Sequence, residues 1–184
     1  MKTKIVVGGG YDTRTDECSE DFFKELLKGL NGEIAVLIVV FAQPEEKHTE
    51  KFEKVVKQFQ RNGPGKNLKF KLAIHQTFEA GLASSDVVYF YSGDTLKLVE
   101  EVGSHRDFLN LIKGKVIAGE SAGTYLLSTK FYSKTIGGVC DGLGVLPIKT
   151  ICHFEDRNEE KLDEISPGLE KVLLRNYDYR VYDI

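Results

Sequence analysis

Ser121 is the residue whose neighbours point most directly to chemistry. It lies within Gly119-Glu120-Ser121-Ala122-Gly123, which follows the apolar run Val116-Ile117-Ala118 and precedes a helix-compatible segment. A serine between glycines at a strand-to-helix turn is typical of a nucleophile elbow, because residues without side chains let the two backbone segments approach closely. The alternative is a glycine-bounded turn with a solvated serine. We favour a serine nucleophile for acyl transfer.

A serine nucleophile needs a base, and the chain has four histidines. His153 follows residues 148–152, a plausible strand, and is the only histidine after the elbow. His75 ends another expected strand and is the reserve candidate, whereas His48 and His105 are expected on the surface. Because triads share geometry and not chain order, the sequence favours His153 without settling the choice.

Two loops could supply amide donors for the oxyanion of acyl transfer. Ala122 directly follows the nucleophile at the start of the expected helix. Ser92-Gly93-Asp94-Thr95 closes another strand and opens another helix, so the Gly93 amide is the candidate partner of the Ala122 amide. The alternative for this segment is a plain Asp/Thr helix cap.

Carboxylates near these residues could orient the base or bind substrate. In the α/β-hydrolase order of serine, acid and histidine, Asp141 is the acid, because it is the only one between Ser121 and His153. The chain lacks the H-G-G-G segment of that fold and is short for it. Glu120 is adjacent to the nucleophile, so we expect it to be a pocket-wall or hydrogen-bonding residue. In the pocket wall, it would receive a substrate's α-ammonium group.

Short apolar runs alternate with amphipathic segments along the chain. The expected strands lack polar alternation, as parallel strands covered on both faces do; they are residues 5–7, 34–41, 70–74, 87–91 and 116–118. The expected helices follow Ser19 and Thr49 as N-caps, and a third begins at Thr95. This order predicts an α/β fold with a doubly wound, mostly parallel sheet, helices on both faces, and a site at the carboxyl ends of the strands.

Gly8-Gly9-Gly10 follows the first expected strand. A dinucleotide fingerprint, G-x-G-x-x-G, would need glycine at position 13, where Thr13 stands. We therefore expect a tight turn whose missing side chains let another loop or a ligand approach.

Length, charge and cysteine content narrow the function classes. The 184 residues fit a single domain, 1–184. With 25 basic and 28 acidic residues and no Lys/Arg block, nucleic acid and membranes are not expected partners.

No apolar stretch suits a signal peptide or a membrane span, which favours the cytoplasm. Cys18, Cys140 and Cys152 form no C-x-x-C pair, so we expect neither disulfides nor a metal site; no cofactor is expected.

Four motifs together resemble the peptidase E (aspartyl dipeptidase) family. They are the Gly-rich first turn, Tyr89-Phe90-Tyr91-Ser92-Gly93-Asp94-Thr95, Ile117-Ala118-Gly119-Glu120-Ser121-Ala122-Gly123, and Leu143-Gly144-Val145-Leu146-Pro147 running to His153-Phe154. The resemblance implies a fold related to class I glutamine amidotransferases and hydrolysis of dipeptides with N-terminal aspartate. It also implies Ser121 as nucleophile, His153 as base, and the amides of Gly93 and Ala122 as the oxyanion hole.

The third catalytic group is where the chain departs from the family pattern. The family's glutamate follows a final strand resembling Arg180-Val181-Tyr182-Asp183-Ile184, where this chain stops, so a further C-terminal segment is expected. Asp141, Glu155 and Asp156 are the other possible acids. Arg157 resembles the family's arginine after the histidine and is the expected anchor for the substrate's aspartyl carboxylate.

Three functions remain open from the sequence. The first is a serine peptidase that hydrolyses short peptides, with a small peptide as its partner molecule. The second is a catalytically impaired or truncated relative that binds a peptide or amino-acid ligand. The third is a cyanophycinase-like hydrolase of aspartate-arginine dipeptide units. The oligomeric state also stays open, with a homodimer as one alternative.

Overall fold

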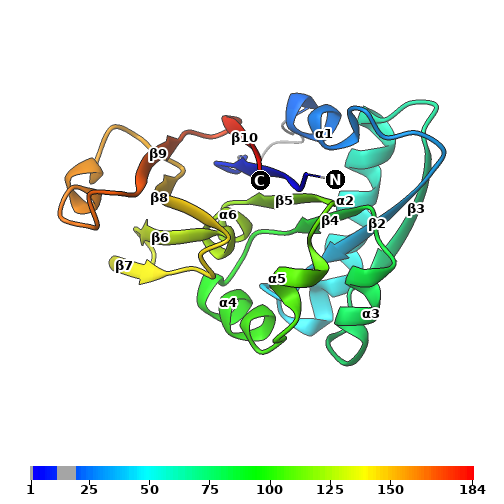
Figure 1. Cartoon of the computed structure of the whole chain (residues 1–184), viewed down its shortest axis with the longest axis horizontal. Coiled ribbons are helices and arrows are strands. Elements are labelled where there is room, and N and C mark those ends of the chain that lie inside the picture. The colour runs from blue at the N-terminus through cyan, green and yellow to red at the C-terminus, as the bar shows by residue number, and fades with distance from the viewer. Residues whose placement is uncertain (1, 12–19) are drawn as a thin grey trace.

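The computed structural model describes residues 2–11 and 20–184. In chain order the first elements are β1 (Lys4–Gly8), α1 (Glu20–Leu27), β2 (Glu33–Val39), α2 (His48–Asn62), β3 (Asn67–Leu72), α3 (Phe78–Ala83), β4 (Val87–Phe90), α4 (Thr95–Gly103), α5 (Phe108–Leu111), β5 (Val116–Glu120) and α6 (Ala122–Leu127). The remaining strands are β6 (Ser128–Ser133), β7 (Gly138–Asp141), β8 (Leu146–Cys152), β9 (Glu170–Leu174) and β10 (Tyr179–Asp183). The strands form two sheets (Figure 1).

The larger sheet has the strand order β10-β1-β5-β4-β2-β3. All neighbouring strands in it are parallel except β10, which runs antiparallel to β1. In Figure 1, β1 lies between β5 and the red strand β10, and backbone hydrogen bonds join Thr3 to Ile184 in both directions. Because β1, β4 and β5 are parallel neighbours, their carboxyl ends meet at one edge of the sheet, where α/β folds bind ligands.

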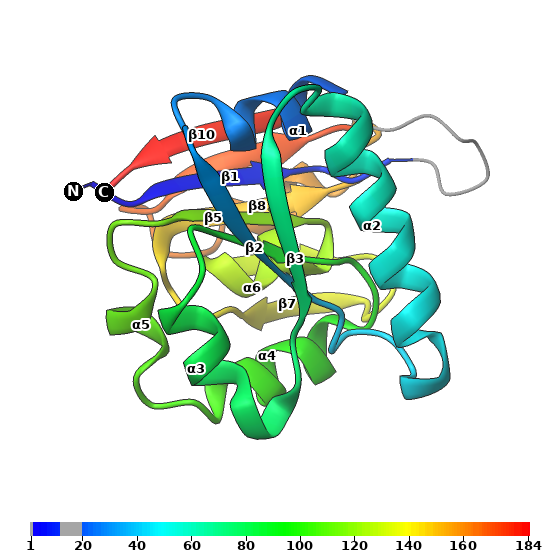
Figure 2. The same ribbon diagram turned by 90° about the vertical axis from the view of Figure 1, so that its right-hand side faces the viewer.

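Helices cover both faces of the larger sheet. α1 and α2, which stand together in Figure 2, pack on one face through Phe22, Phe23, Leu26, Val55 and Phe59. The other face is covered by α3 to α6 and by the second sheet, through side chains such as Phe78, Leu98, Leu126 and Phe131. Burial on both faces explains why β1, β2, β4 and β5 are apolar without alternation. The edge strand β3 differs, because its residues alternate between polar and apolar. The predicted α/β fold, with a doubly wound and mostly parallel sheet, is confirmed.

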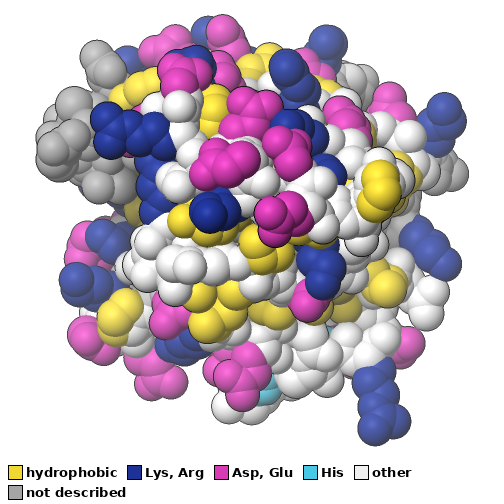
Figure 3. All heavy atoms as spheres, turned by 90° about the vertical axis from the view of Figure 1, so that its left-hand side faces the viewer, with side chains coloured by type: hydrophobic (Ala, Val, Ile, Leu, Met, Phe, Trp, Pro, Cys, Tyr) yellow, Lys and Arg dark blue, Asp and Glu magenta, His cyan; other side chains and the backbone are white. Residues whose placement is uncertain are grey.

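The second sheet has the order β7-β6-β8-β9 and lies on the left in Figure 1. Strands β6, β8 and β9 are parallel, and β7 is antiparallel to β6. Viewed from this side, the surface shows acidic and basic side chains interspersed (Figure 3). The buried side chains Ile148 and Cys152 of β8 belong to the same apolar cluster as Ile5 and Val7 of β1, so the end of β8 is held against the larger sheet.

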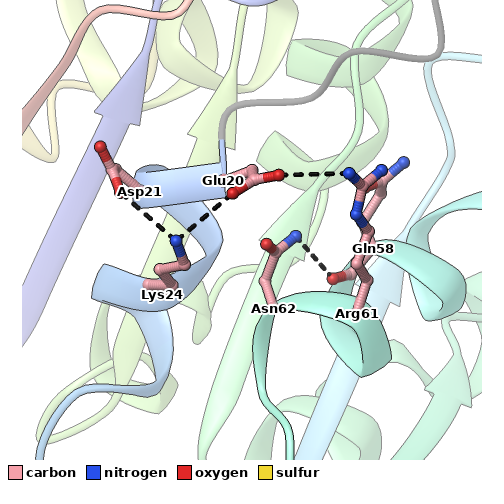
Figure 4. A network of polar contacts seen from close by, with 6 residues as sticks. All are labelled: Glu20, Asp21, Lys24, Gln58, Arg61 and Asn62. Carbon is pink, nitrogen blue, oxygen red and sulfur yellow. Dashed lines mark hydrogen bonds and ion pairs between the residues drawn. The ribbon is translucent and has the colours of Figure 1, made fainter.

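A polar network on the surface joins α1 to α2 (Figure 4). Arg61 of α2 donates to Glu20 at 3.2 Å, and Lys24 donates to Glu20 at 3.4 Å. Asn62 donates to the backbone carbonyl of Gln58 at 2.9 Å. Exposed ion pairs contribute little to stability, so apolar burial beneath these helices is the main stabilising contribution.

Two of the three expected helix starts, those of α2 and α4, lie within the described residues. Ser19, like Cys18, lies outside the described residues. Helix α2 begins at His48, one residue before Thr49, and has no side-chain capping bond, so the predicted Thr49 cap is wrong. Asp94 caps α4 by accepting from the Lys97 amide at 3.1 Å. Within residues 2–11 and 20–184, no helix combines the length and apolar character needed to cross a membrane.

Candidate active site

Ser121 lies at the turn between β5 and α6 with φ 53° and ψ −106°. A non-glycine residue at positive φ is strained and persists only where its surroundings hold it; the Ser121 amide donates to Gly8 O at 3.0 Å. A Cβ on Gly119 would lie 2.3 Å from the Gly123 backbone, and one on Gly123 would lie 2.5 Å from Phe90 O. These two glycines let α6 leave the end of β5 sharply, which is the geometry of a nucleophile elbow.

Thr124 ties the elbow to the end of β1. Its Oγ1 accepts from the Gly8 amide at 3.0 Å, and its hydroxyl lies within donating distance of Gly8 O at 2.7 Å and Gly119 O at 2.8 Å. Thr124 is fully buried, where polar backbone groups need partners. The hydroxyl therefore joins the two strand ends that carry Ser121 and the glycine turn.

His153 meets Ser121 at the carboxyl edge of the larger sheet. Its Nε2 lies 2.9 Å from Ser121 Oγ. The residue directly follows β8, where the Cys152 amide donates to Tyr125 Oη at 2.9 Å, and the His153 amide donates to Gly9 O at 3.2 Å. The structure thus brings the predicted nucleophile and the predicted base within hydrogen-bonding distance.

The two glycines after β1, Gly9 and Gly10, make room for the histidine and for the turn between β9 and β10. A Cβ on Gly10 would lie 2.6 Å from His153 Cε1, and one on Gly9 would lie 2.0 Å from Arg175 O. Gly10 also has φ +92°, and its carbonyl accepts from the Tyr177 amide at 2.8 Å. The expected close approach of other segments to these glycines is confirmed.

The group on the far side of the histidine is an amide. Asn176 lies in the turn between β9 and β10, with its Oδ1 2.6 Å from His153 Nδ1. With Oδ1 as acceptor, Nδ1 carries the hydrogen and Nε2 can accept the Ser121 hydroxyl hydrogen. A Ser-His-Asn arrangement results, comparable to the Cys-His-Asn set of papain-like proteases. A search for carboxylates overlooks Asn176, whose only sequence signal is a polar turn before the final strand.

The three carboxylates considered for that position pair with cations instead. The pairs are Asp141 with Lys130 at 2.5 Å, Glu155 with Lys134 at 3.0 Å and Asp156 with Arg175 at 2.5 Å. The hydrogen bond from Lys134 holds the pKa of Glu155 below its ordinary value. The structure does not bring these acids to the imidazole, whose Nδ1 faces Asn176.

The remaining histidines lie elsewhere. His75 pairs with Glu101 at 3.0 Å and lines a separate cavity of about 280 Å³. His48 Nε2 lies 3.0 Å from Gln43 O. The His105 side chain is only 13% exposed, packed between His75 and Phe78, so the expectation of a solvated surface group is wrong for it.

The two predicted amide donors belong to residues of different loops. Gly93 follows β4 and has φ +145°, a backbone conformation that favours glycine. Ala122 is the first residue of α6, so its N–H has no partner within the helix. Gly93 and Ser121 line one cavity. The placement suits an oxyanion hole, which needs donors aimed at the developing negative charge.

The cavity beside Ser121 has a volume of about 560 Å³, within the roughly 300–1,000 Å³ usual for small-molecule sites. Its walls come from the start of α4, the elbow, the end of β8 and the turn between β6 and β7. Among the described lining residues, Lys134 in that turn is the only lysine or arginine. Arg157 is exposed on the loop after His153 and does not line the cavity.

Glu120 lies in the core and not in the cavity wall. It is 1% exposed, and its Oε2 accepts from the Tyr89 hydroxyl at 2.5 Å. Burial raises the pKa of Glu120 to about 7, outweighing the opposite effect of the Tyr89 hydrogen bond. Its neighbours Val116 and Ala118 on β5 pack in the α1–α2 cluster, and Glu120 points to the same face. The structure therefore does not bring Glu120 to a substrate, contrary to expectation.

Two cysteines lie within the described residues, and one of them, Cys152, is next to His153 in the chain. Cys140 is partly buried and Cys152 is buried, both as free thiols. Burial raises the pKa of Cys152 above its ordinary value, which keeps this neighbour of His153 protonated. Among the residues that the structure describes, no cluster of three or more His, Cys, Asp or Glu is placed to hold a metal ion.

Solved structures share this fold. A peptidase from an acI-B1 actinobacterium is 18% identical, with 99% of this chain and 84% of that chain covered and a TM-score of 0.69. A peptidase E protein from Listeria monocytogenes EGD-e is 19% identical, with 100% and 95% covered and a TM-score of 0.68. The chain thus shares the fold of these two proteins. No curated protein matches the chain significantly in sequence.

A family model assigns the chain more narrowly. The model of peptidase family S51 matches residues 5–177, which include the elbow, His153 and Asn176. The chain belongs to peptidase family S51, and its activity class is that of a peptidase.

Proposed function

We propose that this chain is a serine peptidase that hydrolyses short peptides, with Ser121 as nucleophile, His153 as general base and Asn176 as the residue that orients the base. The observation that carries the proposal is the continuous contact from Ser121 Oγ to His153 Nε2, 2.9 Å, and from His153 Nδ1 to Asn176 Oδ1, 2.6 Å. A nucleophile, a base and an orienting group within hydrogen-bonding distance are the signature of covalent acyl transfer.

The chemistry follows from this geometry. Ser121 Oγ attacks the scissile carbonyl carbon while its hydrogen passes to His153 Nε2, and the amides of Gly93 and Ala122 bind the oxyanion that forms. The imidazolium then gives the same hydrogen to the leaving amine, which leaves an acyl group on Ser121. Water, deprotonated by His153, attacks the acyl group and releases the acid, so Ser121 regains its hydrogen.

A short substrate with an N-terminal aspartate is the second element of the proposal. Lys134 supports it, because this residue lines the cavity that holds Ser121. Its pairing with Glu155 is exposed, with 37% and 75% of the two side chains accessible, and such pairs are weak enough to exchange partners. We propose Lys134, in place of Arg157, as the group that receives the aspartyl carboxylate.

Hydrolysis and covalent labelling test the proposal together. We expect a small fluorophosphonate to label Ser121 alone, as seen by intact mass, and Asp-Leu to be cleaved faster than Asn-Leu. Ser121→Ala and His153→Ala should each lower kcat by about 10⁴- to 10⁶-fold, and the double variant little further, because the pair acts as a unit. Ser104→Ala, an exposed serine after α4, is the matched control.

Several results would contradict the proposal. A wild-type chain that binds aspartyl dipeptides without cleaving them or reacting with the reagent supports the ligand-binding alternative. Additive losses in the double variant reject the Ser-His pair. Cleavage of Asp-Leu and Asn-Leu at equal rates, or an unchanged preference in Lys134→Met, rejects the role given to Lys134.

A further inference from the structure

We infer that Gln43 is a positioning residue of the oxyanion hole, which sets the direction of the Gly93 N–H through the peptide bond that joins Ser92 to Gly93. The inference rests on the proposed peptidase function. It adds Gln43, 49 positions before Ser92 in the sequence, to the residues that hold the catalytic groups in place. Gln43 Nε2 donates to Ser92 O at 2.6 Å.

The planarity of the peptide bond links this contact to the donor. The carbonyl of Ser92 and the N–H of Gly93 belong to one peptide unit, in which they point in opposite directions. No peptide bond in the described residues is cis. Because Gln43 holds the carbonyl on one side, the N–H is held toward the other. Among the described residues, the Ser92 carbonyl accepts no other hydrogen bond.

The peptide on the other side of Gly93 is held by the same loop. The Asp94 amide donates to Ala42 O at 2.9 Å. Neighbouring bonds from Ala42 and Gln43 therefore fix both peptide planes around Gly93, and the φ of +145° at Gly93 is their joint result. A Cβ on Gly93 would lie 2.5 Å from both Ala42 O and Gln43 Nε2, so the contact needs glycine at this position.

Gln43 is itself anchored by its backbone. Its amide donates to Val40 O at 2.9 Å, its carbonyl accepts from Lys97 Nζ at 3.1 Å, and His48 Nε2 lies 3.0 Å from the same carbonyl. The two contacts to the carbonyl come from the start of α2 and the first turn of α4. These backbone contacts fix the point from which the Gln43 side chain reaches the Ser92 carbonyl. A fixed starting point suits a residue that must hold a catalytic donor in place.

The test compares two variants of Gln43 that differ in charge. Gln43→Met keeps the length and removes the donor, and Gln43→Glu adds a carboxylate that repels the Ser92 carbonyl. For both we expect kcat to fall by about 10- to 100-fold, below the 10²- to 10³-fold typical of losing an oxyanion donor outright, with KM changed less than two-fold. The affinity for a peptide aldehyde, which forms a tetrahedral adduct on Ser121, should fall by the same factor as kcat/KM.

A matched control and a structural readout keep the inference separate from the proposed function. Gln60→Met and Gln60→Glu, at an exposed position on α2, should leave kcat and aldehyde affinity unchanged. Crystal structures of the Gln43 variants should show the Ser92–Gly93 peptide rotated. An unrotated peptide overturns the inference even if the wild-type chain proves inactive. A fall in kcat accompanied by an equal rise in KM would also overturn the inference. The same holds if the thermal midpoint falls so far that unfolding at the assay temperature explains the lower kcat.

Discussion

At the scale of single residues, the third member of the proposed catalytic set is a neutral amide. With Asn176 Oδ1 as the acceptor, His153 Nδ1 carries the hydrogen, and this selects the tautomer whose Nε2 can take the Ser121 hydrogen. A carboxylate would select the same tautomer and would in addition stabilise the imidazolium of the transition state. Asn176 thus supplies the orientation without the charge, and the two contributions can be separated by substitution.

We expect Asn176→Ala to lower kcat about 10- to 100-fold, because the imidazole loses its orienting bond while the base itself remains; general acid–base catalysis as a whole contributes about 10²- to 10⁴-fold. Asn176→Asp should raise kcat and move the acid limb of the kcat/KM profile to higher pH, because a carboxylate at this place favours the charged imidazole. Stopped assays of peptide cleavage across pH 5 to 9 measure both effects.

Asn67→Asp, an exposed asparagine at the start of β3, adds the same charge far along the sheet and is the control. An acid limb that does not move in Asn176→Asp would show that Asn176 does not contact the base during the reaction.

At the scale of elements, the site forms where four chain segments meet at one sheet edge. The ends of β1 and β5 carry the glycine turn and the elbow, the end of β8 carries His153, and the turn between β9 and β10 carries Asn176. The antiparallel pairing of β10 with β1 brings that last turn beside the glycines. Glycines are needed at this junction, because a Cβ on Gly9, Gly10 or Gly119 would collide with a neighbouring segment of the chain.

We expect Gly10→Ala to abolish peptide cleavage and Ser121 labelling. Its Cβ would lie 2.6 Å from His153 Cε1, so the imidazole must move away from Ser121. The positive φ adds a backbone cost of roughly 1–2 kcal/mol. Peptide cleavage, Ser121 labelling and urea unfolding of the variant check these expectations.

Gly29→Ala is the matched control, because Gly29 has φ +81° with open space around its Cβ position. It should show the stability loss alone. Equal activity in the two variants would mean that the contact between Gly10 and His153 does not fix the base.

At the scale of the whole molecule, the core contains an ionisable group that opposes folding at neutral pH. Glu120 is buried beneath α1 beside Phe22 and Tyr89, and burial raises the pKa of Glu120 to about 7. A carboxyl whose folded pKa is raised binds more protons in the folded state than in the unfolded one. Its contribution therefore favours folding below the unfolded pKa near 4.5 and is lost as pH rises through 7.

We expect Glu120→Gln to flatten the pH dependence of stability. Glutamine keeps an acceptor for the Tyr89 hydroxyl and removes the titration. The loss of unfolding free energy between pH 4.5 and pH 8 should be smaller in the variant by about 3 kcal/mol, at about 1.4 kcal/mol per unit of pKa. Urea unfolding at the two pH values measures this difference for both proteins.

Glu53→Gln, an exposed glutamate on α2, should leave the difference as in the wild type. A variant that loses as much stability as the wild type over this range would show that Glu120 is already ionised in the folded protein at low pH.

The sequence by itself determined the features that depend on neighbouring residues. The elbow around Ser121, the glycine turn after β1 and the apolar runs of the parallel strands follow from local backbone sterics and from burial on both faces. The sequence also favoured His153 without settling the choice, because this residue follows a plausible strand and is the only histidine after the elbow. The family resemblance then gave the fold class and the peptidase class, both of which hold.

Only the tertiary structure decided the contacts that join distant segments. Asn176 reaches His153 because β10 pairs with β1, and Gln43 reaches Ser92 because the loops after β2 and β4 are neighbours. The sequence could not predict that Glu120 faces the core. A strand that is buried on both faces shows no alternation of polar and apolar residues, so its sequence does not reveal which way each side chain points. Register and loop packing are set by interactions summed over the whole core, so no local pattern of residue types encodes them.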